Sequence, residues 1–435
     1  MIFESLSRFL EKYYTSGTSI LLAYSGGPDS LALLHLLLEY QKIKPFQFAL
    51  AHVDHGWRPE SGLEAAQIEA KAKGLGITLH SKRLDPSAVN GNLEAACREE
   101  RLIFFAGLCQ EHGYRAVLLA HHADDAAETV LKRVLEGSAL PYISGLTPVK
   151  VINGMHLWRP LLEVGKAKLG EWLNERGLVG FLDSTNEDPR FLRGRFRSSI
   201  IPKLSAEFGK DIKQGLCQIG GEAKELRDYL DAKVLKYLNQ VVKGPFGSYL
   251  DLSEDFPGEV LELRHLLRKF CENEGFSLTR DSLKKALDLL TEKASNKRMI
   301  KDGKSLYLDR RHVFVTSNDC KEGVESWSIS VTPVSNTTIK ACTGWKSIWK
   351  GEGFVILPKG DYHLSRPENQ SPYRGTSPLS KWWTDHKIPS FLRFQVPVLC
   401  RDHVVVHEFL SGKVRSKLDE TLDEIEEWVR VSISV

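Results

Sequence analysis

Residues 20–34 read Ile20-Leu21-Leu22-Ala23-Tyr24-Ser25-Gly26-Gly27-Pro28-Asp29-Ser30-Leu31-Ala32-Leu33-Leu34, and this stretch decides the fold. An apolar run enters a Gly–Gly turn and an amphipathic run leaves it, which is the pattern of a buried strand, a tight loop and the start of a helix. Paired glycines let the backbone approach a phosphate, and the free N–H groups and dipole of the first helical turn attract an anion. The sequence therefore predicts a nucleotide phosphate site at residues 25–30.

This loop differs from the Walker A phosphate loop, because the G-x-x-x-x-G-K-[ST] spacing and its lysine are absent. It instead resembles the SGGxDS signature of the PP-loop ATP pyrophosphatases, which split ATP between its first and second phosphates to adenylate a substrate. We predict that ATP is bound by Ser25, Gly26, Gly27, Pro28, Asp29 and Ser30, with Asp29 also near a metal ion. The structural alternative is an ordinary Gly–Gly turn, but Ser25 before it and Asp29-Ser30 after it favour the nucleotide site.

Strand and helix patterns alternate over the first 150 residues. Buried strands are expected at Ser19–Tyr24, Phe46–Val53, Ile77–Lys82 and Ala116–Ala120, and helices at Asp29–Tyr40, Glu60–Lys73, Leu93–Glu111 and Ala123–Leu135. Four β-α units with short links predict an α/β fold with a doubly wound parallel sheet, in which ligands lie beyond the carboxyl ends of the strands. The polar clusters at 25–30, 52–58 and 121–125 are expected to meet at that edge.

The rest of the chain predicts two smaller domains. We place a catalytic domain with an Arg-rich extension at 1–213, a mixed and mainly helical domain at 214–320, and a small β-rich domain at 325–435. The middle domain is expected to hold a long helix over 209–242 with a break at Gly220-Gly221, helices at Leu261–Asn273 and Ser282–Lys293, and strands at Ser305–Leu308 and Val313–Thr316. The last domain is rich in Thr, Val, Trp, Gly and Pro.

Composition narrows the class of protein. Of the 435 residues, 42% are hydrophobic and 26% charged, as in globular proteins that fold in water. The seven cysteines are scattered with no C-x-x-C pair, which favours a cytoplasmic location and argues against a zinc ribbon, an iron–sulfur cluster or a disulfide framework. No leader pattern precedes the first strand and no apolar run is long enough to span a membrane, so we expect no membrane partner.

The distribution of charge is more informative than the formal net charge of +3. Residues 331–415 hold 12 Lys and Arg against 6 Asp and Glu, whereas residues 416–435 hold 2 against 6. The segment Arg190–Lys203 carries five basic residues and no acid. Such patches are compatible with a polyanionic partner such as RNA, although a charged run is more often a solvated face.

Candidate catalytic residues follow the fourth predicted strand in the run Ala120-His121-His122-Ala123-Asp124-Asp125-Ala126-Ala127-Glu128. Asp125 and Glu128 are three residues apart and so share one helical face, where they can hold a cationic amine or a magnesium ion or simply cap the helix. His121, at the strand end, can donate to a phosphate or to developing oxygen charge. On the preceding helix, Arg98 and Arg101 share a face, and surface ion pairing is the alternative role for them.

These motifs, taken in order, resemble the bacterial tRNA(Ile)-lysidine synthases over nearly the whole chain. The resemblance is carried by the residues of the SGGPDS loop, His52-Val53-Asp54-His55-Gly56-Trp57-Arg58, the EAACREER helix, AHHADDAAET, Trp158-Arg159-Pro160-Leu161-Leu162, Asp183-Ser184-Thr185-Asn186, the spaced arginines before Ile201-Pro202-Lys203-Leu204, and Lys381-Trp382-Trp383 with Ile388-Pro389-Ser390-Phe391-Leu392-Arg393. It is strong over 18–205, weaker over 375–410 and weakest over 214–320.

The resemblance implies a reaction and roles for residues. ATP adenylates the C2 oxygen of the wobble cytidine in an isoleucine tRNA with a CAU anticodon; the ε-amine of free lysine then attacks C2, which releases AMP and leaves lysidine. Ser25–Ser30 would hold ATP and Asp29 its Mg²⁺; Asp125 and Glu128 would bind lysine, either one accepting its proton; Arg98 and His121 would steady the adenylated intermediate; Arg193, Arg195 and Arg197 would meet tRNA phosphates. The two later domains would hold the rest of the tRNA, and no DNA partner is expected.

Other functions remain as alternatives. A PP-loop thiolase for cytidine would carry C-x-x-C pairs, and an amidotransferase relative would need a glutaminase unit before the loop; neither feature occurs here. A non-catalytic RNA-binding relative would not need an intact SGGxDS loop together with the HHADD–Glu cluster. The sequence leaves open the oligomeric state and the features of the tRNA that are read outside the anticodon.

Overall fold

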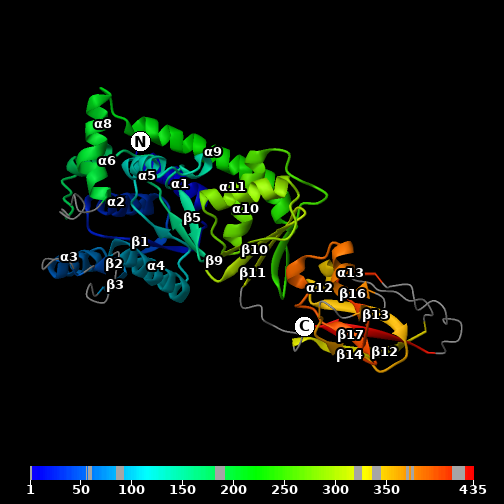
Figure 1. The fold of residues 1–435 in the computed structure, drawn as a ribbon. Helices are drawn as coiled ribbons and strands as arrows, with labels where there is room; N and C mark the ends of the chain where they lie inside the picture. The colour runs from blue at the N-terminus through cyan, green and yellow to red at the C-terminus, as the bar shows by residue number, and fades with distance from the viewer. Residues whose placement is uncertain are drawn as a thin grey trace. The chain divides into compact units, whose positions relative to one another are not determined.

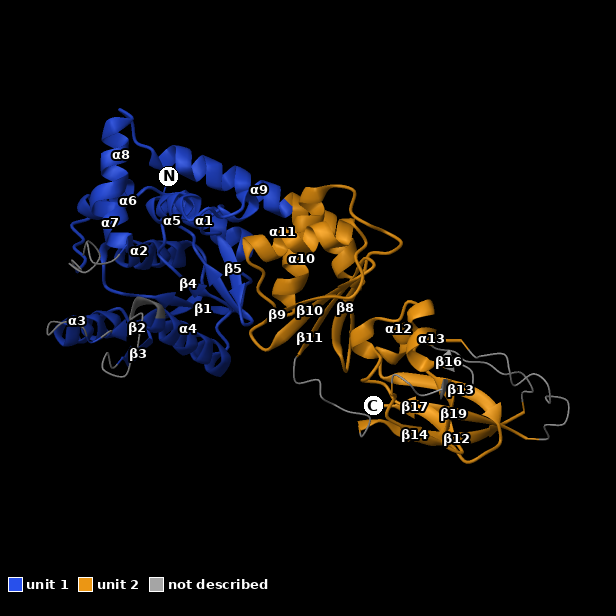
Figure 2. Ribbon diagram, viewed as in Figure 1, with its two compact units in different colours: residues 1–228 blue, residues 229–435 orange. Residues whose placement is uncertain are grey.

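The computed structural model describes residues 2–54, 56, 61–84, 93–181, 192–317, 326–335, 344–368, 372–373, 377–413 and 427–435. The chain divides into two compact units, residues 1–228 and 229–435, which Figure 2 colours separately. The boundary between them falls inside the long helix α9 (Lys213–Leu238). The predicted domain limits at 213 and 320–325 stay predictions.

A six-stranded sheet forms the centre of the first unit (Figure 1). Its strands are β1 (Ser19–Ala23), β2 (Gln47–Asp54), β3 (Leu79–Arg83), β4 (Val117–Leu118), β5 (Val149–Ile152) and β6 (Met155–Trp158), in the order β3-β2-β1-β4-β6-β5. All neighbours are parallel except β5 and β6, which form a hairpin over Asn153 and Gly154. Both turn residues have positive φ, as a two-residue hairpin turn requires. The predicted parallel α/β sheet is confirmed, and the antiparallel edge strand is an addition to it.

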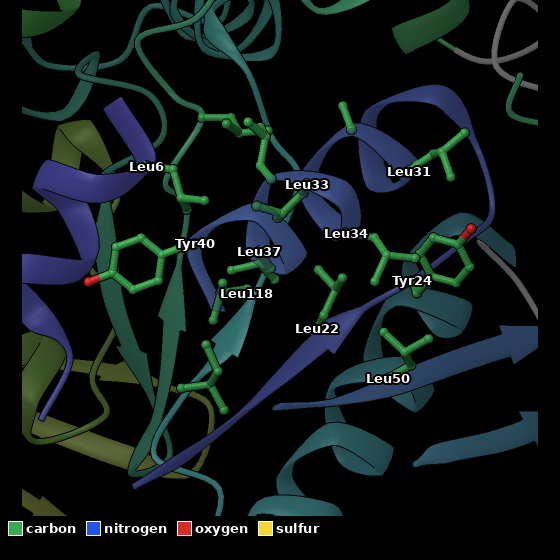
Figure 3. Packing of buried hydrophobic residues seen from close by; sticks show 14 of the residues in the cluster. Leu6, Leu22, Tyr24, Leu31, Leu33, Leu34, Leu37, Tyr40, Leu50 and Leu118 are labelled. Atoms are coloured by element: carbon green, nitrogen blue, oxygen red, sulfur yellow. The ribbon is translucent and has the colours of Figure 1, made fainter. Parts of the chain in front are cut away.

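Helices cover both faces of this sheet. They are α1 (Ile2–Tyr13), α2 (Pro28–Ile43), α3 (Ser61–Gly74), α4 (Leu93–His112), α5 (Ala123–Leu135), a 3-10 turn at Leu140–Tyr142, and α6 (Lys166–Asn174). In β1, Ile20 and Leu22 pack in one cluster with α1, α2, α3 and α6, whereas Leu21 faces the opposite cluster with Phe105 of α4. Figure 3 shows the first cluster, with Leu31 and Leu34 of α2 over Leu22 and Leu50. This alternation buries both faces of β1 under helices, as the doubly wound sheet requires.

An Arg-rich helical segment follows α6. It consists of α7 (Leu192–Arg195), one π turn (Phe196–Ile200) and α8 (Ile201–Glu207), and Phe196 and Ile201 pack on Leu131 of α5. A π turn within a helix is rare and is frequent at functional sites. Here it lies within the predicted tRNA-binding segment.

The predicted break at Gly220-Gly221 is wrong, because α9 continues through both residues. The reason for glycine is packing: a Cβ on Gly220 would lie 2.8 Å from Val130 Cγ2 of α5 and 3.4 Å from the carbonyl oxygen of Ser144. The absent side chain lets α9 pass close to α5, and an isolated glycine inside a helix is tolerated at modest cost.

The second unit combines helices with antiparallel sheets. Its first sheet has the order β7-β8-β11-β10-β9, made of β7 (Val242–Gly244), β8 (Gly247–Asp251), β9 (Lys297–Lys301), β10 (Lys304–Asp309) and β11 (His312–Ser317). Two helices, α10 (Val260–Asn273) and α11 (Arg280–Thr291), cover it through Leu266, Phe270 and Leu287. The predicted helices and strands of this region are confirmed.

Two further sheets follow. One is β12-β19-β13, from β12 (Ser328–Val334), β13 (Glu352–Pro358) and β19 (Trp428–Ser434); the other is β14-β17-β18-β15-β16, from β14 (His363–Ser365), β15 (Pro372–Tyr373), β16 (Ser377–Pro378), β17 (Val398–Arg401) and β18 (Val404–Glu408). Short helices α12 (Trp345–Ile348) and α13 (Leu379–Asp385) and a 3-10 turn (Ser390–Leu392) complete this β-rich part. Within the described ranges, no helix is long and apolar enough to cross a bilayer.

Candidate active site

One cavity of about 460 Å³ gathers most of the predicted site residues at the carboxyl edge of the first unit's sheet. It is lined by Ser25, Gly27, Pro28, Asp29, Ser30, Arg98, His121, Asp125, Arg193 and Arg197. These residues come from the β1–α2 loop, α4, the β4–α5 junction and the Arg-rich segment. A volume of this size suits a small-molecule or nucleotide ligand. Gly26, Glu128 and Arg195 are outside the lining.

The β1–α2 loop is held open by its own hydroxyls and by a neighbouring segment. Ser25 Oγ lies 3.1 Å from Ser30 Oγ, and Ser30 Oγ donates to the carbonyl oxygen of Gly27 at 3.0 Å. Gly26 has a φ of 78°, and a Cβ on it would lie 2.4 Å from the Phe181 ring. Phe181 N–H also donates to the carbonyl oxygen of Gly26 at 2.9 Å. Glycine is therefore required at 26, while the first turn of α2 stays accessible to an anion.

The end of β2 supplies the neighbouring wall. His52 Nδ1 lies 3.0 Å from the carbonyl oxygen of Tyr24, and the buried Asp54 accepts from the N–H of Gly56 at 2.8 Å. Burial acts first and raises the pKa of Asp54, but the N–H of Gly56, Ser61 and Arg83 outweigh it and lower that pKa overall. Asp54 is thus an anion at neutral pH. His55, Trp57 and Arg58 of the same motif lie outside the described residues.

The two predicted lysine-binding carboxylates are paired with two of the predicted tRNA-binding arginines. Asp125 Oδ1 accepts from Arg193 Nη2 at 2.9 Å and also from Arg197 Nη2, while Glu128 accepts from Arg193 Nε at 3.3 Å and from Arg197 Nε at 2.6 Å. Arg193 and Arg197 are four residues apart and share a helical face, as Asp125 and Glu128 do on α5. Both carboxylates are buried, and Arg195 is exposed.

This arrangement keeps Asp125 ionised. Burial, the largest effect, raises the pKa of Asp125, but His122, Arg193, His121 and Arg197 together lower it to about 2. The second oxygen of Asp125 accepts from the backbone N–H of His122 at 3.0 Å, at the N-terminus of α5. The structure therefore brings Asp125, Glu128, Arg193 and Arg197 together as one ion-pair cluster, in which the carboxylates are buried and the arginines partly exposed. Sequence spacing on separate segments did not predict this cluster.

His122 connects the phosphate loop with this cluster. Its Nε2 lies 3.6 Å from Asp29 Oδ2 and 3.5 Å from Asp125 Oδ2, and only 2% of its side chain is exposed. Burial lowers the pKa of His122, yet hydrogen bonding to Asp29 and the charges of Asp125, Asp29 and Asp124 raise it overall. The imidazole stands between one carboxylate of the nucleotide loop and one of the proposed lysine site.

Positive charge gathers at the cavity: Arg98 and Arg101 line it, and the buried Arg159 lies behind the lining. Burial and then the charges of Arg98 and Arg193 lower the pKa of Arg101, and burial with Arg98 lowers that of Arg159 to about 10. Neighbouring arginines that remain protonated near neutral pH suit a polyanion. Arg98 lines the cavity, and its role toward a phosphate stays a prediction.

His121 lies between the arginines and Asp125. Burial is the main cause that lowers its pKa to about 3; Asp125 opposes the shift, and Arg159, Arg193 and Arg101 add to it. The ring is therefore a neutral imidazole throughout the physiological range. A neutral imidazole can donate one hydrogen bond to a phosphate or to a developing oxyanion.

Asp29 is the residue of the phosphate loop that could bind a metal ion. No group of three or more His, Cys, Asp or Glu residues that could hold a metal occurs among the described residues. Mg²⁺, however, commonly uses one or two carboxylates together with substrate phosphates, and Asp29 is a partly exposed carboxylate in the first turn of α2. Asp29 thus fits a magnesium ion that arrives with a nucleotide.

Known proteins match this chain over half to nearly all of its length. A family model described as PP-loop domain matches residues 2–204. A tRNA(Ile)-lysidine synthase from Protochlamydia amoebophila is 36% identical over 96% of this chain and 94% of its own length. The chain belongs to the tRNA(Ile)-lysidine synthase family. A member from Chlamydia muridarum is 31% identical over 73% of this chain and 98% of its own. Among solved structures, the U34-tRNA thiolase NcsA from Methanococcus maripaludis matches with 18% identity and a TM-score of 0.44, covering 52% of this chain and 78% of that one.

Membership of the PP-loop family implies ATP as the nucleotide of this lysidine synthase family member. Sequence reasoning gave no catalytic or binding role to three residues that lie at or next to the cavity: Arg101, which lines it, and His122 and Arg159, which contact residues of its lining. The sequence held a signal for two of them. Arg101 lies three residues after Arg98 on α4, and Arg159 lies in the family motif that follows β6. Nothing in the spacing indicated that His122 would face Asp29, since that contact joins two separate βα loops.

Proposed function

We propose that this chain ligates free lysine to C2 of the wobble cytidine in the CAU anticodon of an isoleucine tRNA, consuming ATP and releasing AMP and pyrophosphate. The observation that supports it most is one cavity that joins the SGGxDS loop, the Arg98 side and the Asp125 side in a chain similar to lysidine synthases over nearly its full length. With lysidine at the wobble position, the CAU anticodon would read the codon AUA instead of AUG.

In the first half-reaction, the loop at 25–30 holds the ATP phosphates. Asp29 would hold a Mg²⁺ ion, which would offset phosphate charge. The C2 oxygen of cytidine attacks the α-phosphorus and pyrophosphate leaves. Arg98 and His121 line the same cavity and supply hydrogen-bond donors toward the adenylate. Adenylation converts a poor leaving oxygen into a good one.

In the second half-reaction, Asp125 and Glu128 bind the lysine ammonium, and one of the two carboxylates accepts its proton. The neutral amine then attacks C2, the bond from C2 to the adenylated oxygen breaks, and AMP leaves. The structure adds a condition to this role, because Arg193 and Arg197 occupy both carboxylates. Lysine can bind there only when one or both guanidinium groups move away. The tRNA phosphates are the natural competitor for those arginines, since arginine binds phosphate and carboxylate with the same geometry.

The function is tested by incubating the purified chain with ATP, Mg²⁺, labelled lysine and transcripts of isoleucine and methionine tRNAs that both carry CAU. Label in the isoleucine transcript alone, with an equal amount of AMP, is the expected result. AMP without lysine incorporation would point to another nucleophile, such as sulfur or ammonia. Binding of tRNA without either product would favour the non-catalytic alternative.

A further inference from the structure

Arg159 is a buried arginine that stands behind the cavity and is not part of its lining. It follows the last residue of β6, and only 3% of it is exposed. Because β6 pairs in parallel with β4, Arg159 and His121 emerge at the same edge of the sheet. The N–H of Leu119 donates to the carbonyl oxygen of Trp158 at 2.8 Å, which sets their register.

The guanidinium of Arg159 is fixed at two points. Its Nη1 donates to the carbonyl oxygen of Thr147 at 2.8 Å, and its Nε lies 3.3 Å from His121 Nδ1. The Thr147 hydroxyl in turn donates to the carbonyl oxygen of Val149, at the start of β5. The direction of the Arg159 fork is thus determined by the backbone leading into the β5–β6 hairpin.

Chemistry then assigns the proton on His121. Arginine has only donors, so in the contact between Arg159 Nε and His121 Nδ1 the ring nitrogen must accept. A ring nitrogen that accepts carries no proton, and in a neutral imidazole the single proton then lies on Nε2. We propose that Arg159 is a positioning residue that holds His121 as the neutral Nε2–H tautomer, so that His121 acts as a hydrogen-bond donor and not as a proton-transferring group.

The surroundings of His121 agree with this assignment. The charged groups around it are Asp125 on α5, Arg101 on α4, Arg193 on α7 and Arg159 after β6; burial has the largest effect, and the net result is a low pKa. A protonated ring would place a further cation among three arginines. The inference rests on the proposed function, in which His121 steadies the adenylated intermediate, and it leaves lysine deprotonation to the carboxylates.

The first test reads the tautomer directly, without any need for turnover. The full chain labelled with ¹⁵N-histidine is studied by long-range proton–nitrogen correlation between pH 5.5 and 8, and His121→Gln identifies the His121 signals. We expect a protonated Nε2 and an unprotonated Nδ1 that do not titrate in this range. A protonated Nδ1, or titration near pH 6.5, would overturn the proposal even in a fully active enzyme.

The second test changes the donor. Arg159→Met keeps the apolar stem but removes donor and charge, so the His121 signals are expected to show both tautomers. The ring should stay neutral between pH 5.5 and 8, because burial is the main cause that lowers the pKa of His121. The rate constant kcat should fall about 10-fold, with the KM for ATP unchanged. Arg159→Lys restores a donor and a charge and is expected to recover the wild-type tautomer and kcat at least in part.

The matched control is Lys150→Met on β5, which removes a nearby positive charge that does not touch His121. It should leave the tautomer as it is. An Arg159→Met protein that keeps the wild-type tautomer would overturn the proposal, and Arg159→Leu, which also has no donor, replaces it where the methionine variant does not fold. A chain with the expected tautomer but no lysine incorporation would overturn the proposed function alone.

Discussion

Asp29 is the residue on which both the nucleotide and the metal proposals depend. Asp29→Asn keeps the size of the side chain but removes the charge that would hold Mg²⁺, so AMP and pyrophosphate release should fall at least about 100-fold. Binding of tRNA should stay the same. Both are measured with labelled ATP and by filter binding. Glu39→Gln, at the far end of α2, is the control; wild-type turnover in Asp29→Asn would remove the loop from the mechanism.

Asp125 gives a prediction on stability and pH. Its pKa is lower in the folded chain, about 2, than the ordinary value of 3.8, so its stabilisation is complete above 3.8 and is lost as the pH falls toward 2. Between pH 4.5 and 2, the free energy of unfolding should therefore fall by roughly 2 kcal/mol more in the wild type than in Asp125→Asn. Urea titrations at a series of pH values measure this, and parallel curves for the two proteins would contradict it.

At the scale of elements, the local sequence pattern was sufficient to predict most helices and strands of the first unit. The strand before Ser25 and the helix after it were predictable because apolar periodicity and a Gly–Gly turn are local signals. The course of α9 through Gly220 could not be predicted, because the glycine is required by the close packing of α5 and not by a turn. The same holds for the β5–β6 edge hairpin, which is too short to give a clear period.

The phosphate loop also depends on an element that the sequence did not connect with it. A Cβ on Gly180 would lie 2.7 Å from Pro28 N and 2.9 Å from the carbonyl carbon of Gly27. Gly180→Ala should therefore displace the loop and weaken ATP binding about 10-fold, the effect of 1–2 kcal/mol of overpacking. Gly170→Ala in α6, where nothing lies within 4 Å of the new Cβ, is the control. Calorimetric titration with a non-hydrolysable ATP analogue compares them, and equal affinities would contradict the bracing role.

The Arg-rich segment divides into two groups of residues. Arg195 is exposed, whereas Arg193 and Arg197 are paired with Asp125 and Glu128. Arg195→Ala should weaken tRNA binding and reduce the slope of log K against log salt by about 1, as loss of one phosphate contact does. Filter binding at several salt concentrations gives this slope. An unchanged slope would mean that Arg195 does not contact the tRNA. The control is Lys224→Ala, which removes an exposed lysine that pairs with Asp228 on α9.

At the scale of the whole molecule, the site is made by contacts between segments far apart in the sequence. Asp125 and Arg193 are 68 residues apart, and Arg159 and His121 are 38 apart. A motif search finds such residues singly but does not say which will pair, because pairing depends on the order of strands in the sheet and on the path of the Arg-rich segment. The residue types of the site were predictable, and their partners were not.

Pairing of Arg193 and Arg197 with the lysine carboxylates predicts that tRNA and lysine bind cooperatively. If phosphates draw the arginines away, lysine should bind more tightly with isoleucine tRNA present, by about 5- to 150-fold, and lysine should raise tRNA affinity by the same factor, because such coupling is reciprocal. Equilibrium dialysis of labelled lysine, with an inert ATP analogue and with or without tRNA, measures the effect of tRNA on lysine binding. Filter binding at saturating lysine measures the effect of lysine on tRNA binding.

The variant Arg197→Lys loses the two-point contact with Asp125 and Glu128. In this variant, lysine should bind more readily without tRNA, and the coupling should shrink. Equal lysine affinity with and without tRNA in the wild type would show that the arginines stay in place and that lysine is held elsewhere.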